Sequence, residues 1–496
     1  DYGLNLCNDI YFVTVVDSSG CTSLDTLLFG SIYGCTDPLS FNYFWGANID
    51  DGSCITAIYG CTDSLALNYD STAHIDDGSC CAINQFFQIG QDIDGEAADD
   101  RSGYAVCLSS DGNTVAIGAH DNDGNGSIQN SGHVRIYENI GGAWSQIGQD
   151  IDGDGFYDLQ FGYSVSLSSD GNIVAIGCSQ NSWNGVDAGS VRIYENTGGS
   201  WSQIGQDIYG LWGDISGWSV SLSSDGNTVA IGAPHNDGNG LWAGTVRIYE
   251  NSGGSWSQIG QDIDGESAGD ISGRSVSLSS DGTIVAIGAP YNDGNGPYSG
   301  HVRIYDNIGG SWSQIGQDID GESADDLSGK SVSLSSDGNT VAIGAIGNGS
   351  GSGHVRVYEN VGGSWTQIGQ DIDGEAAGDQ SGRSVSLSSD GSTVAIGAYA
   401  NDGNGPYSGH VRIYDNIGGS WSQIGLDING EAADDWSGIS VSLSSDGNTV
   451  AIGAPFNDGN GLYAGHVRVY DLANTTLCYG CTDPLALNYD STFAYD

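Results

Sequence analysis

Residues 256–307 read WSQIGQDIDGESAGDISGRSVSLSSDGTIVAIGAPYNDGNGPYSGHVRIYDN, and this stretch decides the fold. Its segments SVSLS, TIVAIGA, HVRIYDN and WSQIGQDI are short, rich in Val, Ile, Ser and Tyr, and bounded by Gly, Asp and Asn, as β-strands are. The Asp-Gly between the first two segments is a strong hairpin signal. No segment has the apolar spacing of a helix. The stretch therefore predicts four antiparallel strands.

The Ser-Ser-Asp-Gly of this stretch occurs seven times in the 496-residue chain, at steps of 53 to 59 residues. A repeat of this length is one unit that cannot bury its apolar face alone, so it must pack against its neighbours. Seven such units predict an all-β fold, a seven-bladed β-propeller with four-stranded blades. The Asp residues of the motif are Asp111, Asp170, Asp225, Asp281, Asp337, Asp390 and Asp446.

The ends of the repeat array predict how the ring closes. FFQIGQDI (residues 86–93) matches the fourth strand, with Phe86 in the place of Trp, but it precedes the first repeat. The last repeat ends after HVRVYD (residues 466–471) without a fourth strand of its own. We therefore expect the N-terminal strand to complete the last blade and remove the open sheet edges.

FGYSVSLS at residues 161–168, with GAP at residues 232–234, 288–290 and 453–455, resembles the FG-GAP repeat. The resemblance covers residues 86–471 and implies the seven-bladed propeller of integrin α-chains and of many secreted bacterial proteins. That family often carries a DxDxDG calcium loop between its first two strands. Because this chain has only the tight SSDG turn there, the family's calcium site is not carried over.

The charge balance limits the possible partners. The chain has 63 acidic and 11 basic residues, a formal net charge of −52. Such a surface repels nucleic acid and anionic membranes and favours cations, so we expect no nucleic-acid partner. No stretch approaches the roughly 20 apolar residues of a membrane-spanning helix, so we expect no direct membrane insertion.

Most of the basic residues occupy repeated positions. One Arg per blade stands in the V-R-[IV]-Y strand, either as a buried ion pair with a loop carboxylate between blades or as part of a ligand-facing ring; we favour the ion pair. Arg274, Lys330 and Arg383 follow the Ser-Gly just before the first strand, and Arg101 lies in an acidic loop. The strand residues are Arg135, Arg192, Arg247, Arg303, Arg356, Arg412 and Arg468.

Eleven patterned cysteines indicate an oxidising compartment. Residues 34–54 (GCTDPLSFNYFWGANIDDGSC) and 60–80 (GCTDSLALNYDSTAHIDDGSC) are two copies of one module, and residues 480–496 begin a third without its closing DGSC. We predict the pairs Cys35–Cys54 and Cys61–Cys80. Because Cys481 lacks a partner and Met is absent, we expect the chain to be part of a longer protein.

Other cysteines lie outside these modules. Cys81 and Cys478 flank the closing strands of the last blade, so we predict a disulfide that staples the ring, and Cys7 pairs with Cys21 in the first segment. Cys107 and Cys178 form either a bridge or two buried thiols. The expected domains are the end of a β-sandwich-like repeat, two cysteine modules, the propeller and a truncated third module, at residues 1–30, 31–57, 58–81, 82–475 and 476–496.

The N-terminal YFVTVVDSSGCTS (residues 11–23) resembles the end of the small β-sandwich repeats in SprB-type gliding adhesins. The GCTD…DDGSC module resembles one in large bacterial surface proteins exported by the type IX secretion system. Together these resemblances imply part of a long, modular, extracellular protein of the bacterial cell surface, with a role in adhesion or gliding motility.

Carboxylates concentrate in the loop from the fourth strand to the next blade, which reads DIDGE or DINGE in five repeats. Oxygen ligands at alternate positions around a Gly turn suit Ca²⁺. A solvated acidic turn explains the pattern equally well, and the spacing is not that of an EF-hand. The predicted structural Ca²⁺ ligands are Asp92, Asp94, Glu96, Asp262, Asp264, Glu266, Asp318, Asp320, Glu322, Asp371, Asp373 and Glu375.

Two further patterns are cation candidates. In the second cysteine module Asn68, Asp70, Asp76 and Asp77 resemble the calcium-binding repeats of thrombospondins, with simple Asx turns as the alternative. The NDGNG motif between the second and third strands, at Asn122, Asn236, Asn292, Asn401 and Asn457, is interpreted as a turn rather than a metal site.

We expect no catalytic activity, because no Ser-His-Asp, Cys-His or HExxH grouping breaks the repeat symmetry. Five His residues recur in GHVR, and one Trp recurs per WSQIGQDI strand, which indicates packing. Blade-specific aromatic residues in loops are better ligand candidates, since they stack on sugar rings. These are Trp183, Trp212, Trp242, Tyr298, Tyr407 and Tyr463, with Trp218 and Trp436.

The sequence leads to an extracellular adhesive or structural module, stabilised by Ca²⁺, that binds a surface polysaccharide or protein. The alternative is a filament or sheath subunit that binds other copies or modules of the same protein. A polysaccharide-cleaving propeller enzyme is the third and least favoured possibility, because it requires a carboxylate pair that breaks the repeat pattern.

Overall fold

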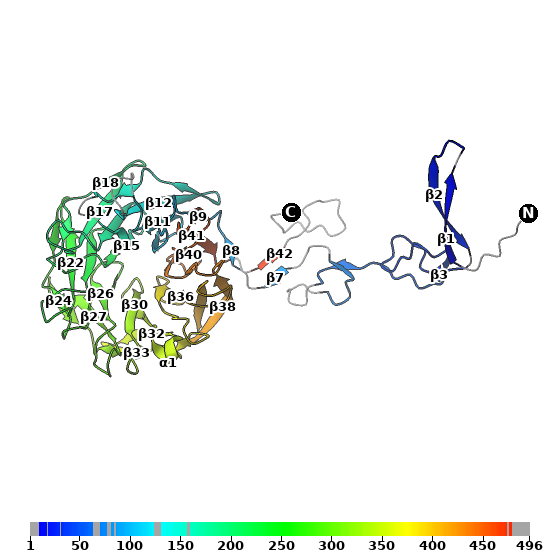
Figure 1. Ribbon diagram of the computed structural model, residues 1–496. Coiled ribbons are helices and arrows are strands. Elements are labelled where there is room, and N and C mark those ends of the chain that lie inside the picture. The colour runs from blue at the N-terminus through cyan, green and yellow to red at the C-terminus, as the bar shows by residue number, and fades with distance from the viewer. Residues whose placement is uncertain are drawn as a thin grey trace, which may run out of the picture. The chain divides into compact units, whose positions relative to one another are not determined.

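The computed structural model describes residues 9–16, 18–29, 31–62, 70–76, 81–83, 86–123, 130–155, 159–473 and 476–478. The chain divides into two compact units, one of residues 86–474 and one of residues 1–85 and 475–496. The larger unit is a seven-bladed β-propeller, so the predicted fold class is confirmed (Figure 1). In the described residues, no helix is both long enough and apolar enough to cross a bilayer.

The first strand of each blade lies at the central channel, where it contacts the first strands of the two neighbouring blades. Around the ring the colours of Figure 1 pass from cyan through green to orange. We number the blades 1 to 7 in chain order. Their first strands are β10 (Ala105–Leu108), β15 (Phe161–Leu167), β20 (Ser219–Leu222), β25 (Ser275–Leu278), β30 (Ser328–Leu334), β35 (Ser384–Leu387) and β39 (Ser440–Leu443).

The second and third strands follow outward in antiparallel register. The second strands, apolar on both faces because they are buried on both sides, are β11 (Thr114–Ala119), β16 (Ile173–Cys178), β21 (Thr228–Ala233), β26 (Ile284–Ala289), β31 (Thr340–Ala345), β36 (Thr393–Ala398) and β40 (Thr449–Ala454). The third strands are β12 (His133–Ile140), β17 (Ser190–Asn196), β22 (Thr245–Asn251), β27 (His301–Asn307), β32 (His354–Val361), β37 (His410–Ile417) and β41 (His466–Asp471).

The fourth strand is split in most blades, and both pieces pair with the third strand. In blades 1 to 5 the pieces are β13 (Ala143–Gln146) and β14 (Ile151–Asp152), β18 (Trp201–Gln203) and β19 (Ile208–Tyr209), β23 (Trp256–Gln258) and β24 (Ile263–Asp264), β28 (Trp312–Gln314) and β29 (Ile319–Asp320), and β33 (Ser364–Gln367) and β34 (Ile372–Asp373). Blade 6 has the continuous β38 (Ser420–Asn429). The helical element α1 (Asn348–Gly351) is a single turn in the blade 5 loop that lacks NDGNG.

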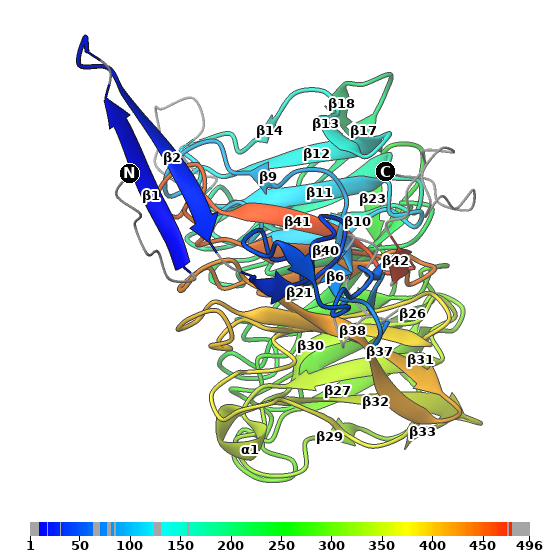
Figure 2. The same ribbon diagram turned by 90° about the vertical axis from the view of Figure 1, so that its right-hand side faces the viewer.

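The ring closes as predicted. The N-terminal strands β8 (Phe87–Gln88) and β9 (Ile93–Asp94) pair with β41 and complete blade 7. Seen from the side, β40, β41 and β9 run together (Figure 2). Phe86 is buried in the cluster that joins blades 6 and 7, where the other blades use Trp.

The repeated Trp residues pack between blades, as predicted. Trp312 of blade 4 is 4% exposed and lies in a cluster with blade 3 residues such as Ile248 and Ile263. Its indole Nε1 donates to the carbonyl of Ile259 at 3.0 Å. Each Trp therefore satisfies its one polar atom while its ring fills the space between neighbouring sheets.

The smaller unit contains the cysteine modules. It has the hairpin β1 (Asp9–Val16) and β2 (Thr22–Phe29), and two parallel pairs with equivalent positions, β3 (Tyr33–Gly34) with β4 (Ile49–Asp50) and β5 (Tyr59–Gly60) with β6 (Ile75–Asp76). Cys35 and Cys54 form the predicted disulfide. Cys61 is also disulfide-bonded, and its predicted partner Cys80 lies outside the described residues, as do Cys7 and Cys481.

The remaining cysteines have different surroundings. β7 (Cys81–Ile83) and β42 (Thr476–Cys478) pair antiparallel with Cys81 directly opposite Cys478, the register that the predicted staple needs. Cys107 and Cys178 are separate thiols rather than a bridge. The Cys107 Sγ accepts the Leu167 amide at 3.3 Å, the place that a Ser hydroxyl takes in other blades, as Ser166 does for Leu222.

Candidate ligand site at the channel mouth

A Gly-X pair at the start of each first strand places the residue X at one mouth of the channel, within the motif Ser-Gly-X-Ser in blades 3 to 7, Ser-Gly-X-Ala in blade 1 and Phe-Gly-X-Ser in blade 2. In blade 4, Gly273 has φ +83°, and a Cβ there would lie 2.7 Å from the Thr245 carbonyl oxygen, so glycine lets two backbones approach. The following Ser275 donates its hydroxyl to the Gly329 carbonyl of the next blade at 2.9 Å. Residue X between them is therefore held at a fixed place on the channel wall.

Residue X differs from blade to blade, whereas the Val two positions later is the same in all seven. We call this ring the variable mouth. It surrounds a cavity of about 230 Å³. Blades 1 to 3 contribute aromatic residues, blades 4 to 6 contribute cations and blade 7 contributes Ile: Tyr104, Tyr163, Trp218, Arg274, Lys330, Arg383 and Ile439.

The aromatic side of the variable mouth is a continuous wall. The ring centroids of Tyr104 and Tyr163 are 5.1 Å apart, and those of Tyr163 and Trp218 are 4.6 Å apart. The two tyrosine hydroxyls are hydrogen-bonded at 3.1 Å. Behind them the buried His120 packs on Tyr104 at 4.2 Å, and burial lowers its pKa to about 3, so it is neutral at physiological pH.

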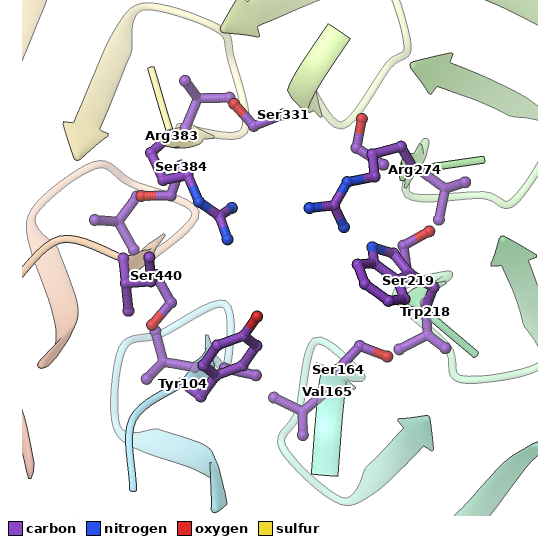
Figure 3. Close-up of a pocket in the computed structure, with 18 of the residues that line it drawn as sticks. Tyr104, Ser164, Val165, Trp218, Ser219, Arg274, Ser331, Arg383, Ser384 and Ser440 are labelled. Carbon is purple, nitrogen blue, oxygen red and sulfur yellow. The ribbon is translucent and has the colours of Figure 1, made fainter. Parts of the chain in front are cut away.

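The cationic side faces this wall. The guanidinium of Arg274 lies 4.4 Å from the Trp218 ring centroid, a cation–π contact that joins the two sides. In Figure 3 the guanidinium groups of Arg274 and Arg383 point from opposite sides into the centre of the pocket. Burial, reinforced by Arg274 and Arg383, lowers the pKa of Lys330 to about 6.

These three cations lack carboxylate partners among the described residues. The other eight Lys and Arg side chains each form at least one ion pair with a carboxylate. In a chain with 63 carboxylates, three unpaired and partly buried cations at one place are unexpected, because burial of an unpaired charge is costly. The variable mouth therefore concentrates positive charge on a strongly negative protein, from the two arginines at neutral pH and from Lys330 as well below about pH 6.

The opposite mouth of the channel is uniform. The second Ser of each SSDG motif donates its amide to the carbonyl of the same Ser in the adjacent blade, at 2.8–2.9 Å, and the seven bonds form a closed ring. Several of the hydroxyls are linked as well. We call this ring the serine mouth; it consists of Ser110, Ser169, Ser224, Ser280, Ser336, Ser389 and Ser445.

The Arg of the third strand is a structural ion pair between blades, as favoured from the sequence. Arg303 is buried, donates Nη2 to the Asp264 carbonyl of the preceding blade at 2.7 Å and lies 3.8 Å from the Glu266 carboxylate. Its guanidinium also stacks on Tyr305 at 5.6 Å. None of the seven arginines of this ring lines the cavity within the described residues.

The acidic loops are not arranged as a one-loop DxDxE site. Glu266 lies instead beside Asp318 and His301 of the following blade, and Glu96, Glu322 and Glu375 repeat this arrangement. Only Asp92 and Asp94 share a cluster from one loop among the described residues, together with His466. The prediction that these loops bind Ca²⁺ is not tested by this geometry, but their carboxylates belong to sites between blades.

The other cation candidates separate into two outcomes. The NDGNG motifs that the structure describes in full, at Asn236, Asn292, Asn401 and Asn457, are turns as predicted. In blade 4, Asn292 is buried, its Oδ1 accepts the Gly294 amide at 2.8 Å and its Nδ2 donates to Asp270. In the second cysteine module, Asp70 accepts hydrogen bonds from Thr72, which lower its pKa. Asn68 and Asp77 lie outside the described residues.

The loop aromatics predicted as ligand residues surround the variable mouth without lining its cavity, as far as the described residues show. Trp242, Tyr298 and Tyr463 contact His235, Tyr291 and Phe456, with ring centroids 5.4–5.7 Å apart. All six of the loop residues are exposed, by 38–72%: Trp183, Trp212, Trp242, Tyr298, Tyr407 and Tyr463. Trp218, named with them, lines the cavity itself.

Sequence reasoning noticed Arg274, Lys330 and Arg383 at their shared position but did not identify a site. The available signal was that Tyr104, Tyr163 and Trp218 fill the same position in the other blades. Because blades follow one another around a ring, three consecutive aromatics and three consecutive cations must face each other.

Comparisons with known proteins agree with this architecture. Residues 263–305 and 372–414 match the model of the FG-GAP repeat. The propeller contains FG-GAP repeats. No curated protein matches the chain.

Among solved structures, hydrazine synthase of Kuenenia stuttgartiensis is similar at 14% identity and a TM-score of 0.50, over 82% of this chain and 99% of that one. The periplasmic gluconolactonase PpgL of Pseudomonas aeruginosa is similar at 16% identity and a TM-score of 0.46, over 66% of this chain and 85% of that one. A putative 6-phosphogluconolactonase of Bacteroides uniformis is similar at 12% identity and a TM-score of 0.46, over the same shares.

The likeness to hydrazine synthase corrects the expectation that the protein is not an enzyme. That structure carries the name of an enzyme, so a propeller of this kind is compatible with catalysis. At such identities the likeness shows the fold alone. The variable mouth also departs from the repeat symmetry, since its residue is aromatic in blades 1 to 3, cationic in blades 4 to 6 and aliphatic in blade 7.

Proposed function

We propose that the propeller is the binding module of an extracellular adhesive protein and that its variable mouth binds an acidic polysaccharide. The observation that carries this proposal is the placement of three unpaired cations opposite a wall of three aromatic rings, in a scaffold whose other channel positions repeat. A wall of cations selects carboxylate or sulfate groups, and a wall of aromatic faces suits the apolar faces of sugar rings.

The cations favour an anionic ligand on energetic grounds. Arg274 and Lys330 are partly buried, and burial lowers the pKa of both. Like charges at close range repel one another, and a ligand carboxylate would relieve that repulsion while forming charge-assisted hydrogen bonds. Such bonds contribute about 1.5–3 kcal/mol each.

The cavity of about 230 Å³ accommodates a short part of a polymer rather than a long segment. The exposed loop aromatics around it, such as Trp242 and Tyr298, offer further stacking positions for the sugar units on either side. The disulfide Cys35–Cys54 and the FG-GAP repeats support an extracellular, adhesive setting.

The net charge of −52 opposes this partner at long range. Salt screens such repulsion, with a Debye length of about 8 Å at physiological ionic strength, whereas contacts inside a partly buried pocket are screened less. We therefore expect binding to strengthen from low to intermediate salt and to weaken again at high salt.

The test is a binding assay of the full chain against acidic and matched neutral polysaccharides, with and without a chelator of divalent cations. Acidic polymers should bind and neutral ones should not, and Trp218→Ala should weaken binding about tenfold through lost stacking and cation–π contact. Shortened products would show that the site also cleaves its ligand. Equal binding of neutral polymers, or of acidic peptides alone, would contradict the proposal.

A further inference from the structure

Five blades contain the same Glu–His–Asp cluster between neighbouring sheets. In blade 4, the Nδ1 atom of His301 lies 4.0 Å from a carboxylate oxygen of Glu266 and 4.0 Å from one of Asp318. Glu266 comes from the loop that follows blade 3, so two blades contribute. The other clusters are Glu96–His133–Asp150, Glu322–His354–Asp371, Glu375–His410–Asp427 and Glu431–His466–Asp92.

The His side chains of these clusters are almost completely buried, each 1% exposed. The Nε2 atom has no hydrogen-bond partner in any of the five, and in His354 and His466 the Nδ1 atom that faces the carboxylates has none either. Buried polar atoms are normally paired, so the unpaired Nε2 atoms, and the unpaired Nδ1 atoms of His354 and His466 that face carboxylates, require an explanation. Separations of 3.7–4.0 Å are too long for hydrogen bonds.

Blades 2 and 3 show what happens without this cluster. Blade 2 has Ser190 at the His position and Asp154 at the Glu position, and blade 3 has Thr245 and Leu211. There the strand Arg turns directly to the remaining Asp: Arg192 Nε to Asp207 and Arg247 Nε to Asp262, both at 2.9 Å.

In the five blades that contain the His, the strand Arg does not bond to the corresponding Asp. The Nε atoms of Arg135, Arg303 and Arg412 have no hydrogen-bond partner, and the nearest carboxylate is that of the Glu, at 3.7–3.8 Å. Glu and His thus occur together and are lost together. In their presence the Asp carboxylate is no longer bonded to the Arg, which lies beside the Glu instead.

The chemistry of these groups is that of a metal site. One carboxylate oxygen of the Asp is held by a Gln, as Gln314 donates to Asp318 at 2.6 Å, which leaves the other oxygen facing the imidazole. Burial, together with the adjacent Arg, lowers the pKa of His301 to about 4, so the ring is neutral and able to bind a metal. The Glu side chain is about half exposed, which gives an ion access from solvent.

We propose that each of these five clusters binds one divalent transition-metal ion of the Zn²⁺ type, between adjacent blades. An imidazole nitrogen with two carboxylate oxygens is a donor set for Zn²⁺ rather than for Ca²⁺, which takes oxygen ligands. Tetrahedral Zn²⁺ with bonds of about 2.1 Å places its ligand atoms about 3.4 Å apart. In the clusters other than that of His466, the ligand atoms lie within 4.8 Å of one another, so the side chains need to move closer by about 1 Å on binding. Water completes the coordination.

This inference is independent of the proposed function, because the clusters lie between blades and the variable mouth lies at the channel. It replaces the expected one-loop Ca²⁺ site by a site built from two blades. Bound ions would fasten blade 7 to blades 1 and 6, where the ring closes, and would join blades 3, 4, 5 and 6 in series.

The test is metal analysis of the full chain after removal of metals, dialysis against micromolar Zn²⁺ and a wash. His301→Thr is the matched substitution, because Thr stands at this position in blade 3. We expect each single His→Thr substitution in a cluster to remove about one Zn²⁺ per chain. The fivefold variant, in which the His of all five clusters is replaced by Thr, should lose about five. Thr245→Ser, outside any cluster, should remove none.

Two further readouts decide the matter. Zn²⁺ should raise the melting temperature of the wild type but not that of the fivefold variant, since a ligand stabilises only the state that it binds. The melting temperature of His301→Gln, measured without metal, shows whether loss of the imidazole itself destabilises the fold. This separates an effect of lost metal from an effect of lost folding. Equal Zn²⁺ content in wild type and fivefold variant, no bound Zn²⁺ in either, or displacement of Zn²⁺ by equimolar Ca²⁺ would each overturn the proposal.

Discussion

The two mouths of the channel are formed at the two ends of the same seven strands, by residues six positions apart in every blade, and they use the repeat in opposite ways. At the serine mouth all blades carry the same residue, and its amides and carbonyls bond to one another around the ring. At the variable mouth the residues differ, and three cations have no partner among the described carboxylates. Where all blades carry the same residue, its polar groups bond to one another within the protein. Where the residues differ, their charged groups remain available to a ligand.

The largest expected effect comes from replacing the cationic side with the residue that blades 1 and 2 already have. The variant Arg274→Tyr, Lys330→Tyr, Arg383→Tyr should lose at least 100-fold in affinity for acidic polysaccharide, because two or three charge-assisted contacts of about 1.5–3 kcal/mol each disappear. Binding is measured by calorimetry and folding by circular dichroism. Retained affinity in a folded variant would show that the difference between the mouths has no role in binding.

A smaller effect should follow from pH. The pKa of Lys330 is lowered to about 6 by burial and by the neighbouring arginines, so its amine is charged below that pH and neutral above it. Affinity for an anionic ligand should therefore fall several-fold, at most about tenfold, as the pH rises from 5 to 8.

The matched control for the pH effect is Lys330→Arg, which stays charged throughout this range. Titrations across the same pH values should give a nearly constant affinity for this variant. If the wild type and Lys330→Arg show the same pH dependence, another group is responsible.

Substitutions beside the serine mouth should have the smallest effect on ligand binding, namely none. Partial burial would raise the pKa of Asp337, but hydrogen bonds from Ser335 and Asn339 outweigh it, so the pKa is lowered. Its contribution to stability is present above its usual pKa of 3.8 and is lost as the pH falls through the lowered value.

Asp337→Ala should accordingly lower the free energy of unfolding by about 1 kcal/mol at neutral pH and less below pH 3, while ligand affinity stays unchanged. Denaturant unfolding at the two pH values, with calorimetric binding at neutral pH, checks both parts. A fall in affinity as large as that of the triple Tyr variant would mean that the two mouths are not independent.

The sequence was sufficient to predict the fold because every blade repeats the same local patterns. The Asp-Gly turn, the alternating strands and the displaced FFQIGQDI segment are local patterns, and together they predict seven blades and the closure by β8 and β9. The ion pair of Arg303 was also predictable, since a buried guanidinium in an acidic chain needs a carboxylate.

The site was not predicted, because its residues are far apart in the chain and each is surrounded by invariant neighbours. Tyr104 and Ile439 are brought to one cavity only when the ring closes. Similarly, Glu266 was grouped with Asp262 and Asp264 of its own loop, whereas the backbone turn carries it across to His301 of the next blade. In both cases packing between blades, which no local pattern encodes, decides which side chains meet.

The pairing of β7 with β42 has a mechanical consequence. The chain enters the propeller through Cys81 and leaves it through Cys478, and these residues are opposite each other at the outer end of the strand pair. A pull on the two ends of the chain therefore loads this pair first and separates it like a zipper, one bond at a time. A disulfide between Cys81 and Cys478 would pass the tension directly from one flanking segment to the other, and the ring would remain slack while the protein is stretched.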